Sequence, residues 1–238
     1  MAESVSRVVA AAVLGAAVAV GGLWVGQGLE GFRTGDRSVT IKGLAEQAVP
    51  ADFALWSLTF KRAGNEFGAV QKALASDRER VMAFLQQRGF TAAEIEVRPL
   101  QVEDNFVRDY SPGQQPLRFT GSGTLIVRTE RIDAVAEAAL AIDPLTQDGV
   151  QIDSASGGPS YHLRGFNDLK APLLAQATAN AKEQAAKFAA EAGAELGALR
   201  RANQGVIQIT GDDGGDYDDG SSRTKRLRVV STFEFMLR

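Results

Sequence analysis

The stretch FNDLKAPLLAQATANAKEQAAKFAAEAG, residues 166–193, decides the fold because it carries the longest regular hydrophobic pattern in the chain. At 3.6 residues per turn, its apolar side chains fall on one helical face. These residues are Phe166, Leu169, Leu173, Ala177, Ala181, Ala185 and Phe188. The middle of this stripe is alanine, so a β-sheet can approach the helix closely. Gly193 is a typical helix terminator. Because Pro172 lies inside the pattern, the helix either begins near Lys170 or begins at Asn167 and bends.

Strand and helix patterns alternate along the rest of the folded part of the chain. Strands are expected at 38–45, 52–62, 94–102, 117–129, 150–156, 199–210 and 226–236, from alternating apolar residues. Amphipathic helices are expected at 67–88 and 132–142, the first with Asn65 as its N-cap and Gly89 after its last turn. Since hairpin-joined strands are interrupted by helices, the sequence predicts an α+β fold with a mainly antiparallel sheet covered by helices.

Near the N-terminus, residues 8–25 (VVAAAVLGAAVAVGGLWV) contain no charged or polar side chain. As a helix, this run is roughly 27 Å long, close to the thickness of the hydrocarbon core of a membrane. The apolar run continues past Ala17-Val18-Ala19, a possible signal-peptidase site, and Trp24 suits a membrane interface. A retained single transmembrane helix is therefore favoured over a cleaved signal peptide, and over a buried soluble helix. Arg7 favours an N-terminus in the cytoplasm.

We therefore divide the chain into a membrane segment at 1–27, a polar linker at 28–37 and one folded domain at 38–238. Composition limits what this domain can do. The chain has no cysteine and one histidine, which excludes disulfides, thiol catalysis and multi-histidine metal sites. A net charge of −3 gives no broad basic surface for nucleic acid.

The segment GDDGGDYDDG, residues 211–220, is the most acidic in the chain. Its aspartates are candidate oxygen ligands for calcium: Asp212, Asp213, Asp216, Asp218 and Asp219. The ligand order of an EF-hand loop fails, because Gly214 and Arg223 stand where oxygen ligands are required. A solvated hairpin tip is the favoured interpretation.

Two further patterns resemble catalytic or phosphate-binding motifs but lack the necessary context. His162 follows Tyr161 just before the long helix, and no nucleophile elbow accompanies it. A hydrolase site combining serine, aspartate and His162 stays open as an alternative. Gly121-Ser122-Gly123 lies inside a strand pattern and has no following helix with a Lys-Ser or Lys-Thr pair. A bend in the strand or the close approach of another backbone is therefore favoured over phosphate binding.

Basic residues form two spots, one at Arg200 and Arg201 and the other at Arg223, Lys225, Arg226 and Arg228. Alternation with Leu227 and Val229 places Arg226 and Arg228 on the outer face of a strand. A solvated face is expected, with anionic lipid or the acidic loop of another subunit as alternative partners.

The chain resembles the SIMPL-domain family, the YggE-like bacterial envelope proteins. The resemblance lies in VTIKGLAEQAVPADFALWSLTF (39–60), RAGNEFGAVQ (62–71), GFTAAEIEVRPLQV (89–102) and LLAQATANAKEQAAKFAAEAGAELGAL (173–199), and it covers about residues 38–238. It implies export to the periplasm or outer envelope, a link to stress tolerance and, in some members, ring- or channel-like homo-oligomers. It supplies no catalytic residues and no cofactor. The apolar N-terminus departs from a free periplasmic protein and favours an inner-membrane anchor.

The leading expectation is thus a non-enzymatic, membrane-anchored domain that faces the periplasm and self-associates. A ligand- or calcium-binding module using residues 211–220 is the first alternative, and a hydrolase is the second. The identity of any small-molecule ligand is open.

Overall fold

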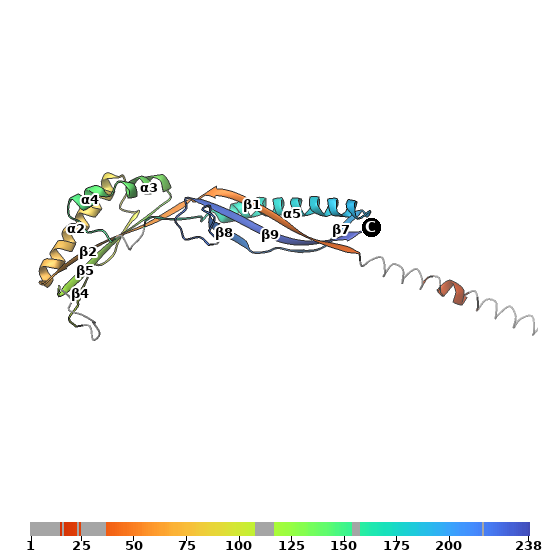
Figure 1. Cartoon of the computed structure of the whole chain (residues 1–238), viewed down its shortest axis with the longest axis horizontal. Coiled ribbons are helices and arrows are strands. Elements are labelled where there is room, and N and C mark those ends of the chain that lie inside the picture. Colours follow the sequence, from red (N-terminus) through yellow and green to blue (C-terminus); the bar gives the residue numbers. More distant parts are fainter. Residues whose placement is uncertain are drawn as a thin grey trace, which may run out of the picture. The chain divides into compact units, whose positions relative to one another are not determined.

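The computed structural model describes residues 15, 17–22, 24, 37–107, 117–153, 158–215 and 217–238. Most of the expected membrane segment lies outside these residues, and none of the helices within them is long and apolar enough to span a membrane. Residue contacts divide the chain, treated above as one domain from residue 38, into two compact units (Figure 1). Unit 1 comprises residues 1–45, 174–206 and 229–238, and unit 2 comprises residues 46–173 and 207–228.

Unit 1 is built on three strands and one long helix. Its elements are β1 (Ser38–Pro50), α5 (Phe166–Glu191), β7 (Leu196–Asn203) and β9 (Thr224–Leu237), and all but β7 continue into unit 2. The strand order is β1-β9-β7, and β7 is antiparallel to β9. Beside this sheet, α5 runs along the strands (Figure 1).

The alanine stripe of α5 is buried, as the sequence predicts, and it allows a very close approach of the sheet. Ala177, Ala181, Ala185 and Ala189 are at most 1% exposed. A Cβ atom added to Gly43 of β1 would lie 2.1 Å from the carbonyl oxygen of Ala177. Small residues on both sides therefore set the spacing between helix and sheet.

The sequence places Phe188 on the apolar face of this helix, and this prediction is wrong because the side chain is 51% exposed. The buried row advances in steps of four residues, so Ala189 continues it and Phe188 faces away. Helix α5 begins at Phe166 and keeps Pro172 in its interior, which resolves the two alternatives for its start in favour of the longer helix. Gly193, with φ of 66°, ends the segment as expected.

Unit 2 consists of a five-stranded antiparallel sheet with helices against it (Figure 1). Its elements are β2 (Phe53–Gly64), α2 (Phe67–Gln87), β3 (Ile95–Val97), β4 (Gln101–Asp104), β5 (Phe119–Thr129), α3 (Ile132–Leu140), α4 (Asp143–Gln147), β6 (Ser160–His162) and β8 (Ile207–Gly211). The order is β3-β5-β2-β6, and β4 also pairs with β5, whereas β8 pairs with β9. Trp56, Leu58 and Phe60 of β2 join Leu74 and Val81 of α2 in the core. The predicted α+β class with antiparallel sheets is confirmed.

Several strand boundaries differ from the sequence expectations. The segment 94–102 is two short strands, since no strand covers residues 98–100, where Pro99 has no N–H to donate. The segment 199–210 is also two strands, because residues 204–206 interrupt it. The segment 150–156 forms a single bridge between Ile152 and Phe60 in its described part.

Two short elements and one helix cap were missed or misassigned. Strand β6 and helix α4 were not expected, because three- and five-residue elements carry too little periodicity. Glu66, rather than Asn65, is the N-cap of α2, and the Asn65 side chain instead accepts a hydrogen bond from the backbone N–H of Arg118. Gly89 follows α2 with φ of 83°, as expected.

We expect Gly43→Ala to destabilise the protein by about 1–3 kcal/mol, because the added methyl group collides with the backbone of α5. Gly68→Ala is the matched control, since a Cβ there meets nothing within 4 Å and the residue lies in helix α2. The control should be neutral or stabilising by up to about 1 kcal/mol. Urea unfolding of both variants measures the difference, and equal stabilities would contradict the close packing of α5.

Candidate functional site

Two hollows lie beside helix α3 in unit 2, and both are lined by Asp133 and Arg223. The smaller, of about 510 Å³, is near the start of α3. The larger, of about 670 Å³, runs along the helix and is called the α3 groove below. Its helix wall consists of Asp133, Ala136, Glu137, Ala139 and Leu140, and its opposite wall consists of Gly158, Pro159, Tyr161, Ser221 and Arg223.

Three residues that pair across neighbouring strands of the sheet position both walls of the α3 groove. Ala54 of β2 pairs with Thr129 at the end of β5 on one side and with Tyr161 of β6 on the other. Because neighbouring strands are about 4.8 Å apart, Thr129 and Tyr161 are held roughly 10 Å apart across β2. Helix α3 begins three residues after Thr129. The pairing of Ala54 with Thr129 and Tyr161 therefore fixes both the position where α3 begins and the position of the tyrosine on the opposite wall.

An ion pair crosses the groove. Arg223 Nη1 lies 3.3 Å from Asp133 Oδ1, and the two side chains are 58% and 87% exposed. Such an exposed pair contributes little stability, so another charged group can separate it at small cost. Tyr161 is only 6% exposed. Desolvation raises the pKa of its phenol, Arg223 lowers it and Asp133 raises it, so the hydroxyl stays protonated at neutral pH.

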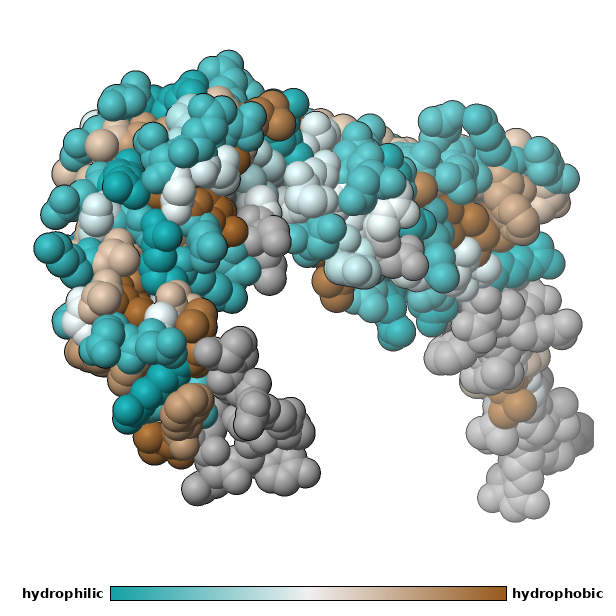
Figure 2. Space-filling model, turned by 60° about the vertical axis from the view of Figure 1, so that its left-hand side comes forward, coloured by the Kyte–Doolittle hydropathy of each residue, from teal (hydrophilic) through white to brown (hydrophobic). Residues whose placement is uncertain are grey.

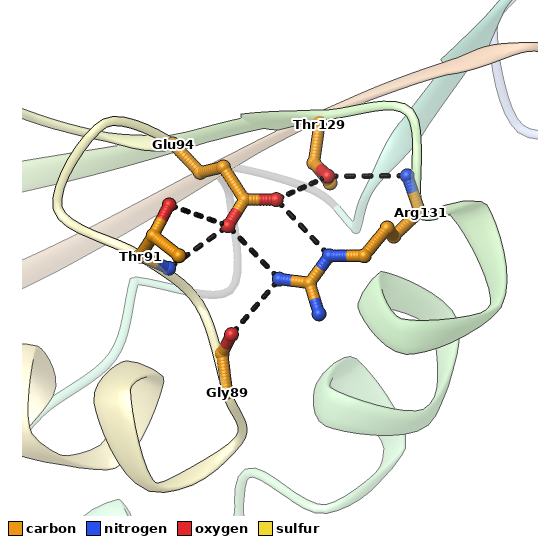
Figure 3. A network of polar contacts seen from close by, with 5 residues as sticks. All are labelled: Gly89, Thr91, Glu94, Thr129 and Arg131. Atoms are coloured by element: carbon orange, nitrogen blue, oxygen red, sulfur yellow. Dashed lines mark hydrogen bonds and ion pairs between the residues drawn. The ribbon is translucent and has the colours of Figure 1, made fainter.

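Glu94 holds the start of α3 through a network of hydrogen bonds (Figure 3). Its Oε1 accepts from Thr129 Oγ1 at 2.6 Å and from Arg131 Nε at 3.1 Å. Its Oε2 accepts from the N–H and hydroxyl of Thr91 at 2.8 and 2.9 Å and from Arg131 Nη2 at 2.9 Å. Arg131 also donates to the carbonyl of Gly89 at 3.0 Å, which ties the end of α2 to the start of α3.

The charge of Glu94 is strongly favoured in this network. Burial by itself would raise the pKa of its carboxyl, but hydrogen bonds from Arg131, Thr129 and Thr91 outweigh burial and lower the pKa to about 2. Arg131 is therefore committed to Glu94, although it also lines the smaller hollow. The network is a structural clamp that fixes one wall of the site.

Within the described residues, the aspartates of the acidic loop have partners in the same chain. Asp212 accepts from Arg226, Asp213 from the N–H of Gly215, Asp218 from Lys225 and Asp219 from Ser221. Asp216 lies outside the described residues. In the described part of the chain, no three His, Asp or Glu side chains gather in a way that could hold a metal ion. Calcium binding stays a prediction, and a titration of the protein with calcium tests it.

The sequence predicts a solvated basic spot that includes Lys225, and this prediction is wrong for Lys225 because its side chain is fully buried. Its Nζ lies 2.6 Å from Asp218 Oδ1, so the lysine anchors the acidic loop to β9. The alternation of inward and outward residues along β9 could have predicted this burial, because Lys225 lies on the same inward face as Leu227. Arg226 and Arg228 point outward as expected, and they pair with Asp212 and Glu46 of the same chain.

His162 is exposed on β6, with Nε2 3.1 Å from Ser160 Oγ. The serine hydroxyl also donates to the carbonyl of Leu55 at 3.1 Å. Because a hydroxyl has one proton, His162 must donate to Ser160 in this arrangement, which is the opposite of a general base. Asp52 accepts instead from the N–H groups of Arg164 and Gly165.

The remaining sequence candidates have packing roles. Gly121 and Gly123 lie in β5, where a Cβ would be 2.5 Å from Leu74 and 2.4 Å from Phe60. Close neighbours therefore account for these glycines, but they are mainly side chains, and only Gly121 also approaches a backbone atom, the carbonyl oxygen of Gln101. Arg200 pairs with Glu234 at 3.2 Å in unit 1. The α3 groove itself was missed, because its walls come from segments distant in sequence.

Comparison with known proteins gives one finding. Residues 39–228 match the family model SIMPL, described as a protein of unknown function (DUF541). No curated protein matches the chain.

Glu94→Gln should lower the free energy of unfolding at pH 7 by about 2 kcal/mol, because a neutral amide replaces a carboxylate with several charge-assisted bonds. Since the folded pKa of Glu94 is below its unfolded value, this stabilisation is complete above pH 4.5 and is lost as the pH falls toward 2. Urea unfolding between pH 7 and pH 2.5 measures the gap between parent and variant. A gap that is independent of pH would contradict the clamp, and Glu79→Gln, on an exposed face of α2, is the control.

Asp218→Asn should cost about 3 kcal/mol, because it leaves the Lys225 ammonium buried without a counter-charge. Asp212→Asn is the matched control from the same loop. Its partner Arg226 is 46% exposed, so the control should cost less than about 1 kcal/mol. Thermal or urea unfolding compares the two variants, and equal losses would mean that Lys225 is hydrated.

Proposed function

The chain belongs to the SIMPL family, whose function is unknown, and on that premise we propose that it is a non-enzymatic protein of the bacterial envelope. In this proposal, residues 8–25 anchor it in the inner membrane and residues 38–238 face the periplasm. The observation that carries the proposal is the run of 18 residues without a polar side chain at 8–25. Arg7 on the short N-terminal side supports the orientation.

The non-enzymatic part is supported by how the candidate catalytic groups are used. Ser160 donates its proton to a backbone carbonyl, so His162 has no nucleophile to deprotonate there. Asp52 holds two backbone N–H groups at the start of α5. These contacts assign the three side chains to local structure.

Self-association is supported by the strand edges and by the surface. Strand β7 is at one end of the unit 1 sheet, and most of its residues are exposed. On the face shown in Figure 2, hydrophobic residues form small separate patches among hydrophilic ones. Weak interfaces of this kind assemble best when a common membrane raises the local concentration of the chains. A part in envelope stress tolerance is the role that family resemblance suggests.

Intact mass of the protein extracted from membranes tests the anchor. We expect the mass of the chain including residues 8–25, together with protease access to the C-terminal units from the periplasmic side. A mature chain beginning near Val20 in the soluble periplasmic fraction would contradict the anchor.

Cross-linking of the same detergent extract tests assembly. Oligomers are expected with the full chain at micromolar concentration. A matched sample lacking residues 1–27 should form fewer, because its chains are no longer concentrated on one surface. A strictly monomeric full chain would contradict self-association but leave the anchor standing.

A further inference from the structure

The outer face of α3 combines acidic and apolar side chains in one stripe. Asp133, Ala136, Glu137 and Leu140 follow the spacing i, i+3, i+4, i+7, so they share one side of the helix, and all four line the α3 groove. Leu140, the last residue of α3, is 87% exposed. The stripe thus offers two carboxylates beside an apolar surface.

The opposite wall offers an aromatic ring with an unused hydroxyl. Tyr161 is only 6% exposed, and it lines the α3 groove. Among the residues that the structure describes, none forms a hydrogen bond with its hydroxyl. A molecule bound in the groove can supply a hydrogen-bond acceptor or donor to this hydroxyl. Pro159 extends this wall with further apolar surface.

The charge of the groove favours a cation. Asp133 and Glu137 face a single guanidinium, that of Arg223, so the lining has a net charge of −1. In the adjoining hollow, Glu130 adds a negative charge and Arg131 is neutralised by Glu94. Arg223 already lies against Asp133, so a positively charged group of this chain occupies one of the positions that an external cation would take.

We propose that the α3 groove binds a small organic cation with a short apolar body. The ammonium or guanidinium group pairs with Glu137 and Asp133, and the apolar body packs on Leu140 and Pro159. The hydroxyl of Tyr161 forms a hydrogen bond with the ligand from the opposite side. A volume of about 670 Å³ is within the range of small-molecule sites. This inference does not depend on the membrane anchor or on self-association.

Three probes with the same phenyl group and different charge test the proposal: phenethylamine (cation), phenylalanine (zwitterion) and hydrocinnamate (anion). Ligand-observed NMR titration of the full-length chain in detergent measures their affinities at pH 7. We expect affinity to fall in that order, with no binding of hydrocinnamate to the groove. Hydrocinnamate binding as tightly as phenethylamine would overturn the proposal, because it would identify Arg223 as the recognition group.

Variants then locate the bound cation. Glu137→Gln should weaken phenethylamine binding by up to about fivefold, the effect of one exposed charge pair. Arg223→Ala should tighten it severalfold, because Asp133 is released from its internal partner. Tyr161→Phe, which keeps the ring and removes the hydroxyl, should weaken it.

Glu79→Gln is the matched control, since it makes the same change of charge on α2 and does not line the groove. Because each titration compares variant and parent in the same detergent, partition of the amine into micelles cancels. Weaker binding by Arg223→Ala, or equal binding by the parent, Glu137→Gln and Glu79→Gln, would overturn the proposal.

Discussion

The pairing of β2 with β5 is the constraint on which unit 2 depends. Its register runs without a break from Ala54↔Thr129 to Gly64↔Phe119. One face of this ladder carries the large side chains of the core, and glycines in β5 leave room for Phe60 and for α2. Since Ala54 also pairs with Tyr161, a slip of one residue would reverse the faces of the strand and separate both walls of the α3 groove.

Burial decides which charged residues are structural. Asp77 is 1% exposed and accepts two hydrogen bonds from Arg62, Asp218 neutralises the buried Lys225, and Glu94 accepts from Arg131. These contacts hold α2 to β2, the acidic loop to β9 and the end of α2 to the start of α3. The buried charges of Asp77 and Lys225 would destabilise the fold without a partner. Charged residues on the surface are under no such requirement. Asp133, Glu137 and Arg223 are surface charges of this kind, so they can exchange partners with little loss of folding free energy.

The two units use small residues and large residues for different purposes. In unit 1, alanines of α5 and Gly43 bring helix and sheet so close that backbone atoms are in contact. In unit 2, Trp56, Phe60 and Leu74 fill a thicker core between sheet and helix. The thin core explains why a helix with so little hydrophobic side-chain volume is still fully buried along one side, since close contact compensates for small area.

The sequence by itself determined the α+β class, the long helix with its alanine stripe, the glycines that follow α2 and α5, and the inward and outward parity of β9. These features follow from local periodicity and from backbone preferences, which neighbouring residues carry. Only the tertiary structure decided that Lys225 is a buried anchor, that Phe188 faces away from the sheet and that the 94–102 and 199–210 segments are each divided in two. It alone brought α3, Tyr161 and Arg223 into one groove, because those segments are up to 90 positions apart in sequence and meet only through the register of the sheet.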